Sequence, residues 1–203
     1  MSDKISKEKE KSILSAARKR FAHYGFSKVT MDEIAGDVEM GKASLYYYFP
    51  TKEDLFKAVV IQEQNEFVSN IESVLQKQTS AEEKLNEYVE LRLKYFHELV
   101  NLGMLSVHSV FDIKSIFKKL FEDFELQELI LLKKIIDEGK NTGEFNSNLS
   151  EDFTKILLHI LQGLRFRVIK LLSEHKASEE TYKELECEMK IAAEYLIKGI
   201  KSN

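Results

Sequence analysis

The chain has 203 residues, of which 43% are hydrophobic and 32% are charged, with one proline and eight glycines. This composition is typical of a soluble globular protein, and because good helix formers dominate it we predict a nearly all-helical fold. No apolar run approaches the roughly 20 residues that span a bilayer, and the polar N-terminus does not resemble a secretory signal. Since the single Cys187 cannot form an internal disulfide, we expect a cytoplasmic protein without a membrane partner.

The net charge of −4 is unevenly distributed. Residues 1–57 contain eleven Lys and Arg against nine Asp and Glu, whereas the rest contains nineteen against twenty-five. Basic character is therefore confined to the first quarter of the chain, which is expected if only that end meets DNA phosphates.

Three helices are predicted in this first quarter. The first covers Lys7–Tyr24 and ends at Gly25, a natural C-terminal cap. Thr30 to Glu33 form a capping box that begins a short second helix. After a three-residue connection, a third helix covers Lys42–Phe49 and is ended by Pro50.

Helical periodicity continues through the remainder of the chain, with no strand-like alternation and no internal repeat. We predict further helices over Thr51–Lys77, Ala81–Val100, Met104–Phe111, Ser115–Lys140, Ser150–Ser173 and Ser178–Lys198.

The second and third helices form a plausible helix-turn-helix, a DNA-binding motif. A projection at 100° per residue places Leu45, Tyr48 and Phe49 on the inward side of the third helix. The outward side carries Lys42, Ala43, Ser44, Tyr46 and Tyr47. An ammonium, hydroxyls, phenols and a small residue are suited to base edges and phosphates, so we predict DNA contacts for these five. The alternative is that the tyrosines belong to the core.

Thr30 and Lys52 each lie at the start of a helix that flanks the third helix. Backbone amides and the helix dipole favour phosphate at such positions, so we predict phosphate contacts for both residues. For Thr30, a role as a helix cap alone is sufficient and stays open.

The first quarter of the chain resembles the tetracycline-repressor (TetR) family of bacterial regulators. The matching motifs are Ile13-Leu14-x-Ala16-Ala17, Phe21-x-x-x-Gly25-Phe26, Thr30-Met31-Asp32-Glu33-Ile34-Ala35 and Lys42-Ala43-Ser44-Leu45-Tyr46-Tyr47-Tyr48-Phe49-Pro50-Thr51-Lys52-Glu53-Asp54-Leu55. The resemblance implies a helix-turn-helix domain over residues 1–50 and a helical effector-binding and dimerisation domain over residues 51–203. It also implies a homodimer that represses genes from a palindromic operator and leaves DNA when a small molecule binds the C-terminal domain.

Three residues depart from the family pattern. Glu39 stands where the turn usually has glycine, so it must adopt a left-handed conformation or reshape the turn. Gly41 replaces a common capping serine and loses the side-chain bond. Asp32 offers no cationic base contact, so we expect base reading to rest mainly on Lys42, Ala43 and Ser44.

Aromatic and histidine side chains recur in the C-terminal domain, and they are candidates for the lining of an effector pocket or simply for the core. These candidates are Phe67, Tyr88, Tyr95, His108, Phe111, Phe117, Phe121, Phe124 and His159. Such a pocket would be largely apolar, so a hydrophobic or aromatic effector is expected. His108 and Asp112 lack a third metal ligand nearby, and no catalytic or phosphate-binding motif is present, so we expect no metal, no cofactor and no enzyme.

The last two predicted helices carry long apolar stripes, which either pack within one chain or form a four-helix dimer interface. The interface candidates are Phe153, Leu157, Ile160, Leu161, Leu164, Val168, Leu185, Met189, Ala192 and Leu196.

Two functions follow from these patterns. The first is a DNA-binding repressor released by a small molecule. The alternative is a helical small-molecule-binding protein that has lost operator recognition, which Glu39 and the negative net charge would favour.

Overall fold

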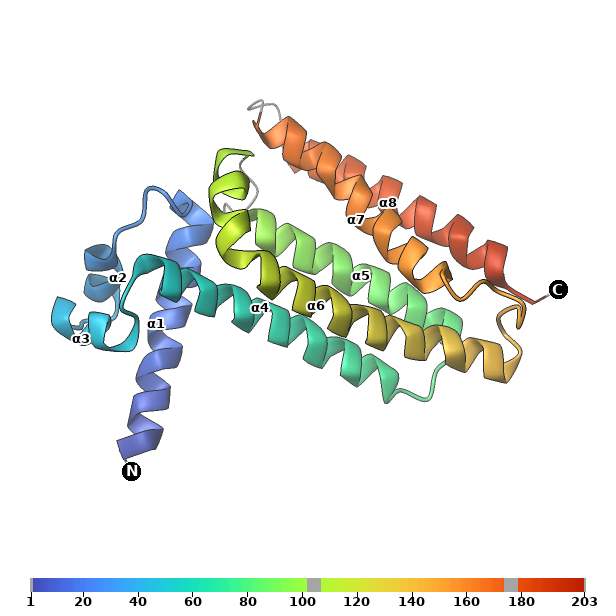
Figure 1. Cartoon of the computed structure of the whole chain (residues 1–203), viewed down its shortest axis with the longest axis horizontal. Helices are drawn as coiled ribbons and strands as arrows, with labels where there is room; N and C mark the ends of the chain where they lie inside the picture. The colour runs from blue at the N-terminus through green and yellow to red at the C-terminus, as the bar shows by residue number, and fades with distance from the viewer. Residues whose placement is uncertain (1, 102–106, 174–178, 203) are drawn as a thin grey trace. The chain divides into compact units, whose positions relative to one another are not determined.

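The computed structural model describes residues 2–101, 107–173 and 179–202, and these residues form an all-helical protein (Figure 1). The helices are α1 (Ser2–Tyr24), α2 (Met31–Asp37), α3 (Lys42–Tyr48), α4 (Lys52–Leu75), α5 (Ala81–Asn101), α6 (Val107–Thr142), α7 (Phe153–Ser173) and α8 (Glu179–Ile200). An isolated bridge between Phe145 and Lys201 is the one β contact among the described residues.

The sequence prediction was wrong about the middle of the chain. It expected separate helices over residues 104–111 and 115–140, whereas α6 is continuous from Val107 to Thr142. The intervening Asp112, Ile113 and Lys114 include neither glycine nor proline, so nothing in the backbone chemistry interrupts the helix. Helix α7 begins at Phe153 rather than Ser150, because residues 150–152 form a turn in which the Phe153 amide donates to the Ser150 carbonyl.

The chain divides into two compact units, the first of residues 1–65 and 97–117 and the second of residues 66–96 and 118–203. The expected domain boundary after residue 50 falls inside the first unit. In this unit, α1 packs on α2 and α2 packs on α3. Phe21 of α1 meets Phe56 of α4 edge to face, with ring centroids 5.0 Å apart. Ile34 of α2 and Leu45 of α3 are also fully buried, so the apolar core of this unit holds both short helices.

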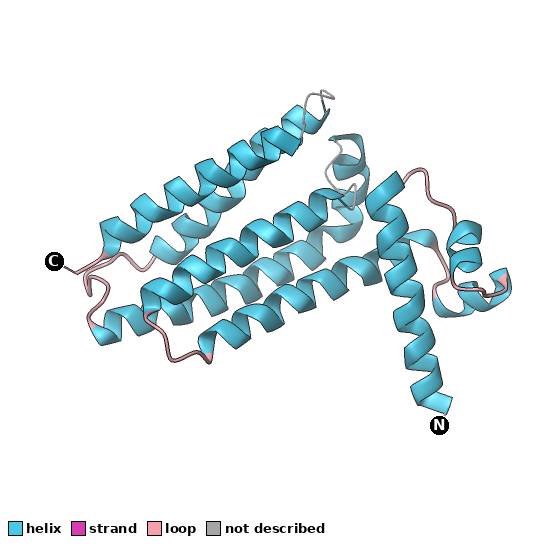
Figure 2. Ribbon diagram, turned by 180° about the vertical axis from the view of Figure 1, so that it is seen from behind, coloured by secondary structure: helices cyan, strands magenta, loops and turns pink. Residues whose placement is uncertain are grey.

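The second unit contains the end of α4, most of α5 and α6, and helices α7 and α8, and successive helices run in opposite directions (Figure 1; Figure 2 shows the same helices from behind). Helices α7 and α8 pack against each other along the bundle. The fully or nearly fully buried apolar residues include Leu85, Tyr88, Leu132, Ile135, Leu157, Leu158, Met189 and Ile197.

Ion pairs join the helices of this bundle. The buried Lys84 ammonium of α5 lies 2.6 Å from Glu138 of α6, and Lys190 of α8 lies 3.1 Å from Glu90 of α5.

The segment after α6 closes the end of the second unit. The carboxylate oxygens of Glu144 accept hydrogen bonds from the backbone amides of Ala81 and Glu82, each at 3.2 Å, at the start of α5. Phe145 is buried against Gly139, where an added Cβ would lie 2.1 Å from the Phe145 ring. The absence of a side chain at residue 139 therefore permits this close approach.

None of the helices formed by the described residues is both long and apolar enough to cross a membrane.

Candidate nucleic-acid interface

Helix α2 begins with the capping box that the sequence predicts. The Thr30 hydroxyl accepts a hydrogen bond from the Glu33 amide at 3.3 Å, and the Glu33 carboxylate accepts one from the Thr30 amide at 2.8 Å. The Thr30 amide and hydroxyl hold the pKa of Glu33 below its usual range because they stabilise the charged form. The cap role of Thr30 is thereby confirmed, while its contact with phosphate stays a prediction.

The turn between α2 and α3 contains Glu39, whose φ of 52° is left-handed. Of the two outcomes expected for a non-glycine residue in this turn, Glu39 therefore adopts the left-handed conformation, which is costly for a residue with a Cβ. Gly41 caps α3 without a side-chain hydrogen bond, as expected. The departure from the family pattern is thus absorbed by the backbone of one residue.

Helix α3 has the predicted division into two faces. Leu45 and Phe49 are buried, and Tyr48 is half-buried. The outward residues Lys42, Ala43 and Ser44 are exposed, as are Tyr46 at 39% and Tyr47 at 85%. The alternative that Tyr46 and Tyr47 are core residues is therefore excluded.

Lys42 forms an ion pair that the sequence did not predict. Its Nζ lies 2.9 Å from Asp32 of α2, and this hydrogen bond raises the pKa of Lys42. No pattern in the sequence indicates this pairing, because the two residues are ten positions apart and meet only through the turn.

A second ion pair ties α1 to α2. Arg20 donates to both carboxylate oxygens of Asp37 and also lies 3.4 Å from Glu33. The hydrogen bond to Asp37 raises the pKa of Arg20, and the same contact lowers the pKa of Asp37. No periodicity in the sequence indicates this pairing.

Lys52 lies at the start of α4, as predicted, and its ammonium is used within the chain. Nζ donates to the carbonyls of Phe26 and Val29, each at 3.0 Å, and lies 4.4 Å from the centre of the Phe26 ring. Two of the three N–H donors are thus engaged in holding the loop before α2. A phosphate contact for Lys52 stays a prediction.

Four of the predicted effector-pocket residues form one aromatic cluster in the second unit. Phe67, Tyr88, Tyr95 and Phe124 are all buried. The Phe67 ring lies 5.1 Å from Tyr95 and 5.7 Å from Phe124. The four residues thus lie together in a packed core, and their role in lining an effector pocket stays a prediction.

A buried ion pair, which no sequence pattern indicates, lies beside this aromatic cluster. Arg92 of α5 lies 3.0 Å from Glu128 of α6, which also accepts a hydrogen bond from the Tyr88 hydroxyl at 2.8 Å. Burial raises the pKa of Tyr88 well above its usual value. The guanidinium carbon of Arg92 lies 5.9 Å from the Phe67 ring centre. The cluster therefore combines aromatic surface with one compensated pair of charges.

Phe121 and His159 are the other pocket candidates whose side chains the structure describes, and neither is fully buried. Phe121 is half-buried, and His159 is 49% exposed with its ring 3.7 Å from Glu125. His159 therefore lies at the surface of the single chain, and its place in a pocket lining stays a prediction. The side chains of His108, Phe111 and Phe117 lie outside the described residues.

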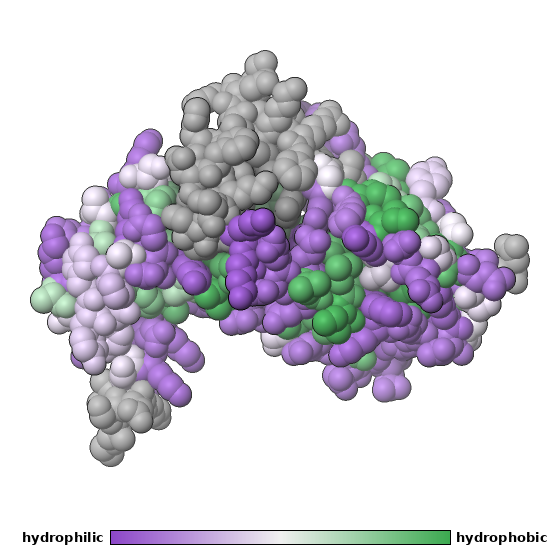
Figure 3. Space-filling view, viewed as in Figure 1, coloured by the Kyte–Doolittle hydropathy of each residue, from purple (hydrophilic) through white to green (hydrophobic). Residues whose placement is uncertain are grey.

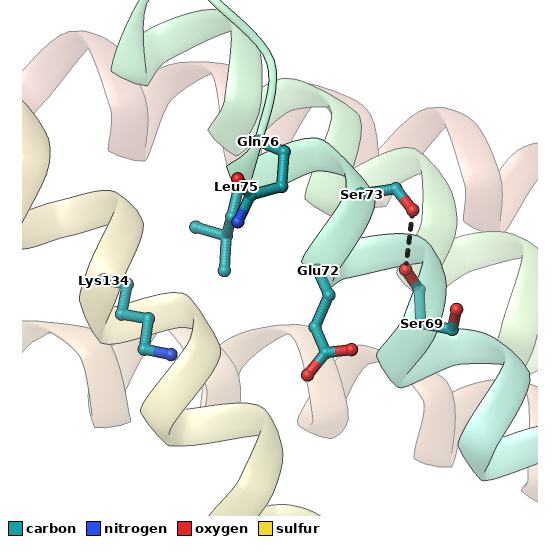
Figure 4. A pocket seen from close by; sticks show the side chains of 6 residues that line it. All are labelled: Ser69, Glu72, Ser73, Leu75, Gln76 and Lys134. Carbon is teal, nitrogen blue, oxygen red and sulfur yellow. Dashed lines mark hydrogen bonds between the residues drawn. The ribbon is translucent and has the colours of Figure 1, made fainter.

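A groove of about 360 Å³ lies elsewhere in the second unit, between α4 and α6 (Figure 4). It is lined by Ser69, Glu72, Ser73, Leu75, Gln76 and Lys134. Apart from Leu75, this lining is polar, and it includes none of the predicted aromatic residues. Among the residues that the structure describes, no three His, Cys, Asp or Glu side chains are grouped to hold a metal ion.

Several residues predicted for the dimer interface on α7 and α8 are buried inside the single chain. Phe153, Leu157, Leu161 and Met189 are buried within the single chain, so they have almost no area left to bury against a partner. Ile160, Ala192 and Leu196 are half-buried. The side chains of Leu164, Val168 and Leu185 lie outside the described residues.

Among the described side chains of α7 and α8, the large apolar residues that are exposed are not those of the predicted interface. Ile156 is 49% exposed, Ile191 is 48% exposed and Tyr195 is 71% exposed. Figure 3 shows apolar patches on the surface of this unit. The apolar periodicity of the sequence indicates that α7 and α8 have an apolar face, but it does not indicate which apolar residues face outward.

Comparison with known families places nearly the whole chain. Residues 13–59 match the family described as "Bacterial regulatory proteins, tetR family", and residues 63–202 match the "QacR-like protein, C-terminal region". The chain is 28% identical over 154 residues to the HTH-type transcriptional regulator QacR of Staphylococcus aureus, covering 75% of this chain and 81% of that protein.

Solved structures agree with this placement. A transcriptional regulator from Cytophaga hutchinsonii superposes with a TM-score of 0.86 at 41% identity, covering 94% of this chain and 97% of that one. A TetR transcription regulator from Haloarcula marismortui superposes with a TM-score of 0.79 at 25% identity, covering 97% of this chain and all of that one. The exposed face of α3, the capped helices around it and these matches lead to one conclusion: the chain belongs to the TetR family of DNA-binding transcriptional regulators, which are not enzymes.

Proposed function

We propose that this protein is a homodimeric, cytoplasmic repressor that binds a palindromic operator and leaves it when a small hydrophobic or aromatic effector binds. The observation that carries the proposal is the outward face of α3, which exposes Lys42, Ala43, Ser44, Tyr46 and Tyr47. The opposite face of the same helix is buried in the core and holds the helix in place. These groups supply donors for base edges and phosphates, and Thr30 and Lys52 flank them as candidate phosphate contacts.

The homodimer is supported by the exposed apolar side chains on α7 and α8. A surface that presents Ile156, Ile191 and Tyr195 on two adjacent helices fits a self-complementary interface with a second copy. A two-fold symmetric dimer would present two copies of α3 to DNA, and the preferred operator would then be palindromic.

The effector class is supported by the aromatic cluster of Phe67, Tyr88, Tyr95 and Phe124, together with the buried pair of Arg92 and Glu128. Aromatic walls with a small number of polar groups are typical of sites for small apolar ligands. A ligand can enter only if the packed rings separate, so ligand binding would move the helices that carry these rings.

The test is a binding titration against the duplex DNA that flanks the gene, with an unrelated duplex of equal length as the control. Repressors of this class bind specific DNA at least about a thousandfold more tightly than unrelated DNA, and both affinities fall with added salt. Equal affinity for the two duplexes at every salt concentration would contradict operator recognition. Release by candidate hydrophobic and aromatic compounds is then measured on the same complex.

A further inference from the structure

The ion pair between Lys42 and Asp32 lies on the surface that we propose for DNA. Nζ of Lys42 is 2.9 Å from each carboxylate oxygen of Asp32, and both side chains are 61% exposed. An exposed pair of this kind contributes little to folding stability. A carboxylate at a DNA-facing position also repels phosphates, so neither stability nor general attraction to DNA accounts for Asp32.

The pair retains hydrogen-bonding capacity on its solvent side. An ammonium has three donors, and a carboxylate has about four lone-pair sites, so one contact between them leaves both groups able to bind a further partner. Lys42 and Asp32 together therefore present a donor beside an acceptor, held about one hydrogen-bond length apart. Their position at the starts of α3 and α2 keeps both backbones fixed by the core of the first unit (Figure 1).

A G·C base pair presents the complementary pattern in the major groove. Guanine O6 and N7 accept hydrogen bonds, and the neighbouring N4 amino group of cytosine donates. O6 and N4 are hydrogen-bonded to each other across the base pair, so their separation matches that of the two side-chain groups. A T·A pair also offers an acceptor beside a donor, but the thymine methyl group stands where guanine offers N7.

We propose that Asp32 is a specificity-determining residue and that Lys42 and Asp32 read one G·C base pair of the operator as a unit. Lys42 donates to guanine O6 and N7, and Asp32 accepts from the N4 amino group of cytosine. An A·T or C·G pair at this position places an acceptor opposite the carboxylate, and a T·A pair places a methyl group where the ammonium would meet N7. The wrong site is therefore rejected by repulsion or by a lost contact. The inference rests on the proposed operator binding.

The experiment is selection of duplexes from a randomised library by the full-length protein and three variants, followed by affinity measurements on the selected sequence with each base pair replaced in turn. The variants are Asp32→Ala, Lys42→Ala and Glu53→Ala. Glu53 is exposed in the first turn of α4. Glu53→Ala also removes one negative charge from the first unit, but at a different place, so it serves as the control.

For the wild-type protein, we expect replacement of one particular G·C pair to weaken binding by about 5- to 150-fold. Asp32→Ala and Lys42→Ala should each lose most of this discrimination at that same position and keep the preferences elsewhere. Glu53→Ala should keep every preference and strengthen binding to all duplexes slightly. The thermal midpoints of all variants should stay close to that of the wild type, because the three side chains are exposed.

Two results would overturn the inference. One is an Asp32→Ala protein that keeps the full wild-type preferences and differs only in overall affinity, as the Glu53→Ala control does. The other is a selected site in which no G·C pair depends on Lys42. A wild-type protein that selects no sequence over unrelated DNA is a different outcome, because it contradicts the proposed operator binding itself.

Discussion

Among single residues, Glu39 shows how the helix-turn-helix accommodates a residue other than the glycine that is usual in the family. Its backbone is left-handed at φ 52°, and its amide donates to the Gly36 carbonyl to close the turn. The left-handed conformation costs a residue with a Cβ about 1–2 kcal/mol, and glycine avoids most of this cost. The turn is therefore kept at the expense of stability.

Replacement of Glu39 by glycine should raise the free energy of unfolding by about 1 kcal/mol, because the strain at φ 52° is relieved. Urea denaturation of the full-length protein measures this change. Glu53→Gly is the matched control, and it should lower the stability by up to about 1 kcal/mol because Glu53 lies in the helix α4. A destabilised Glu39→Gly protein would show that the Glu39 side chain stabilises the turn.

At the scale of elements, local signals predicted most helix boundaries and missed the contacts between helices. The capping box at Thr30 and the stop before Pro50 depend on neighbouring residues, so they can be read from the sequence. The pairing of Lys42 with Asp32 depends on how α2 and α3 pack, and no short-range pattern encodes it. Likewise, an apolar stripe on α7 or α8 does not reveal which of its edges faces outward.

Gly139 should resist substitution by alanine although it lies inside a helix. Its added Cβ would lie 2.1 Å from the ring of Phe145, a buried residue, so Gly139→Ala should lower the stability by about 1–3 kcal/mol. Gly36→Ala in α2 meets nothing within 4 Å and should instead stabilise by about 0.5–1 kcal/mol. Chemical denaturation of the two variants measures both signs, and a stabilised Gly139→Ala would contradict the packing described for Phe145.

Glu144 should make the start of α5 sensitive to pH. Burial raises its pKa, but the hydrogen bonds from the Ala81 and Glu82 amides outweigh burial, and the net pKa lies below the usual value. A lowered folded-state pKa means that this stabilisation is present above the unfolded-state pKa of about 4.3 and is lost as the pH falls through the folded-state pKa.

The variant Glu144→Ala should therefore be less stable by about 1–2 kcal/mol at neutral pH, and the difference should shrink under acid conditions. Urea denaturation at both pH values measures it, with the exposed Glu151→Ala as control. A difference that is the same at both pH values would show that the charge of Glu144 does not stabilise α5.

At the scale of the whole molecule, the exposed apolar face of α7 and α8 predicts self-association. Ile191 and Tyr195 are one helical turn apart on α8 and exposed at 48% and 71%. A charge introduced at Ile191 would have to be buried without a partner in a dimer, so Ile191→Glu should produce monomers. Sedimentation or light scattering gives the mass. Tyr24→Glu, at an exposed aromatic residue of α1, should leave the dimer intact. A dimeric Ile191→Glu protein would exclude Ile191 from the interface.

We propose that the outward face of α3 recognises the operator, and the affinity of the Lys42→Ala protein for the wild-type operator tests this role. Lys42 is exposed, so the variant should keep its thermal midpoint and lose about 1–3 kcal/mol of operator binding, while Lys118→Ala in the second unit should bind as the wild type does. Unchanged operator affinity of a folded Lys42→Ala protein would contradict operator recognition by this face of α3.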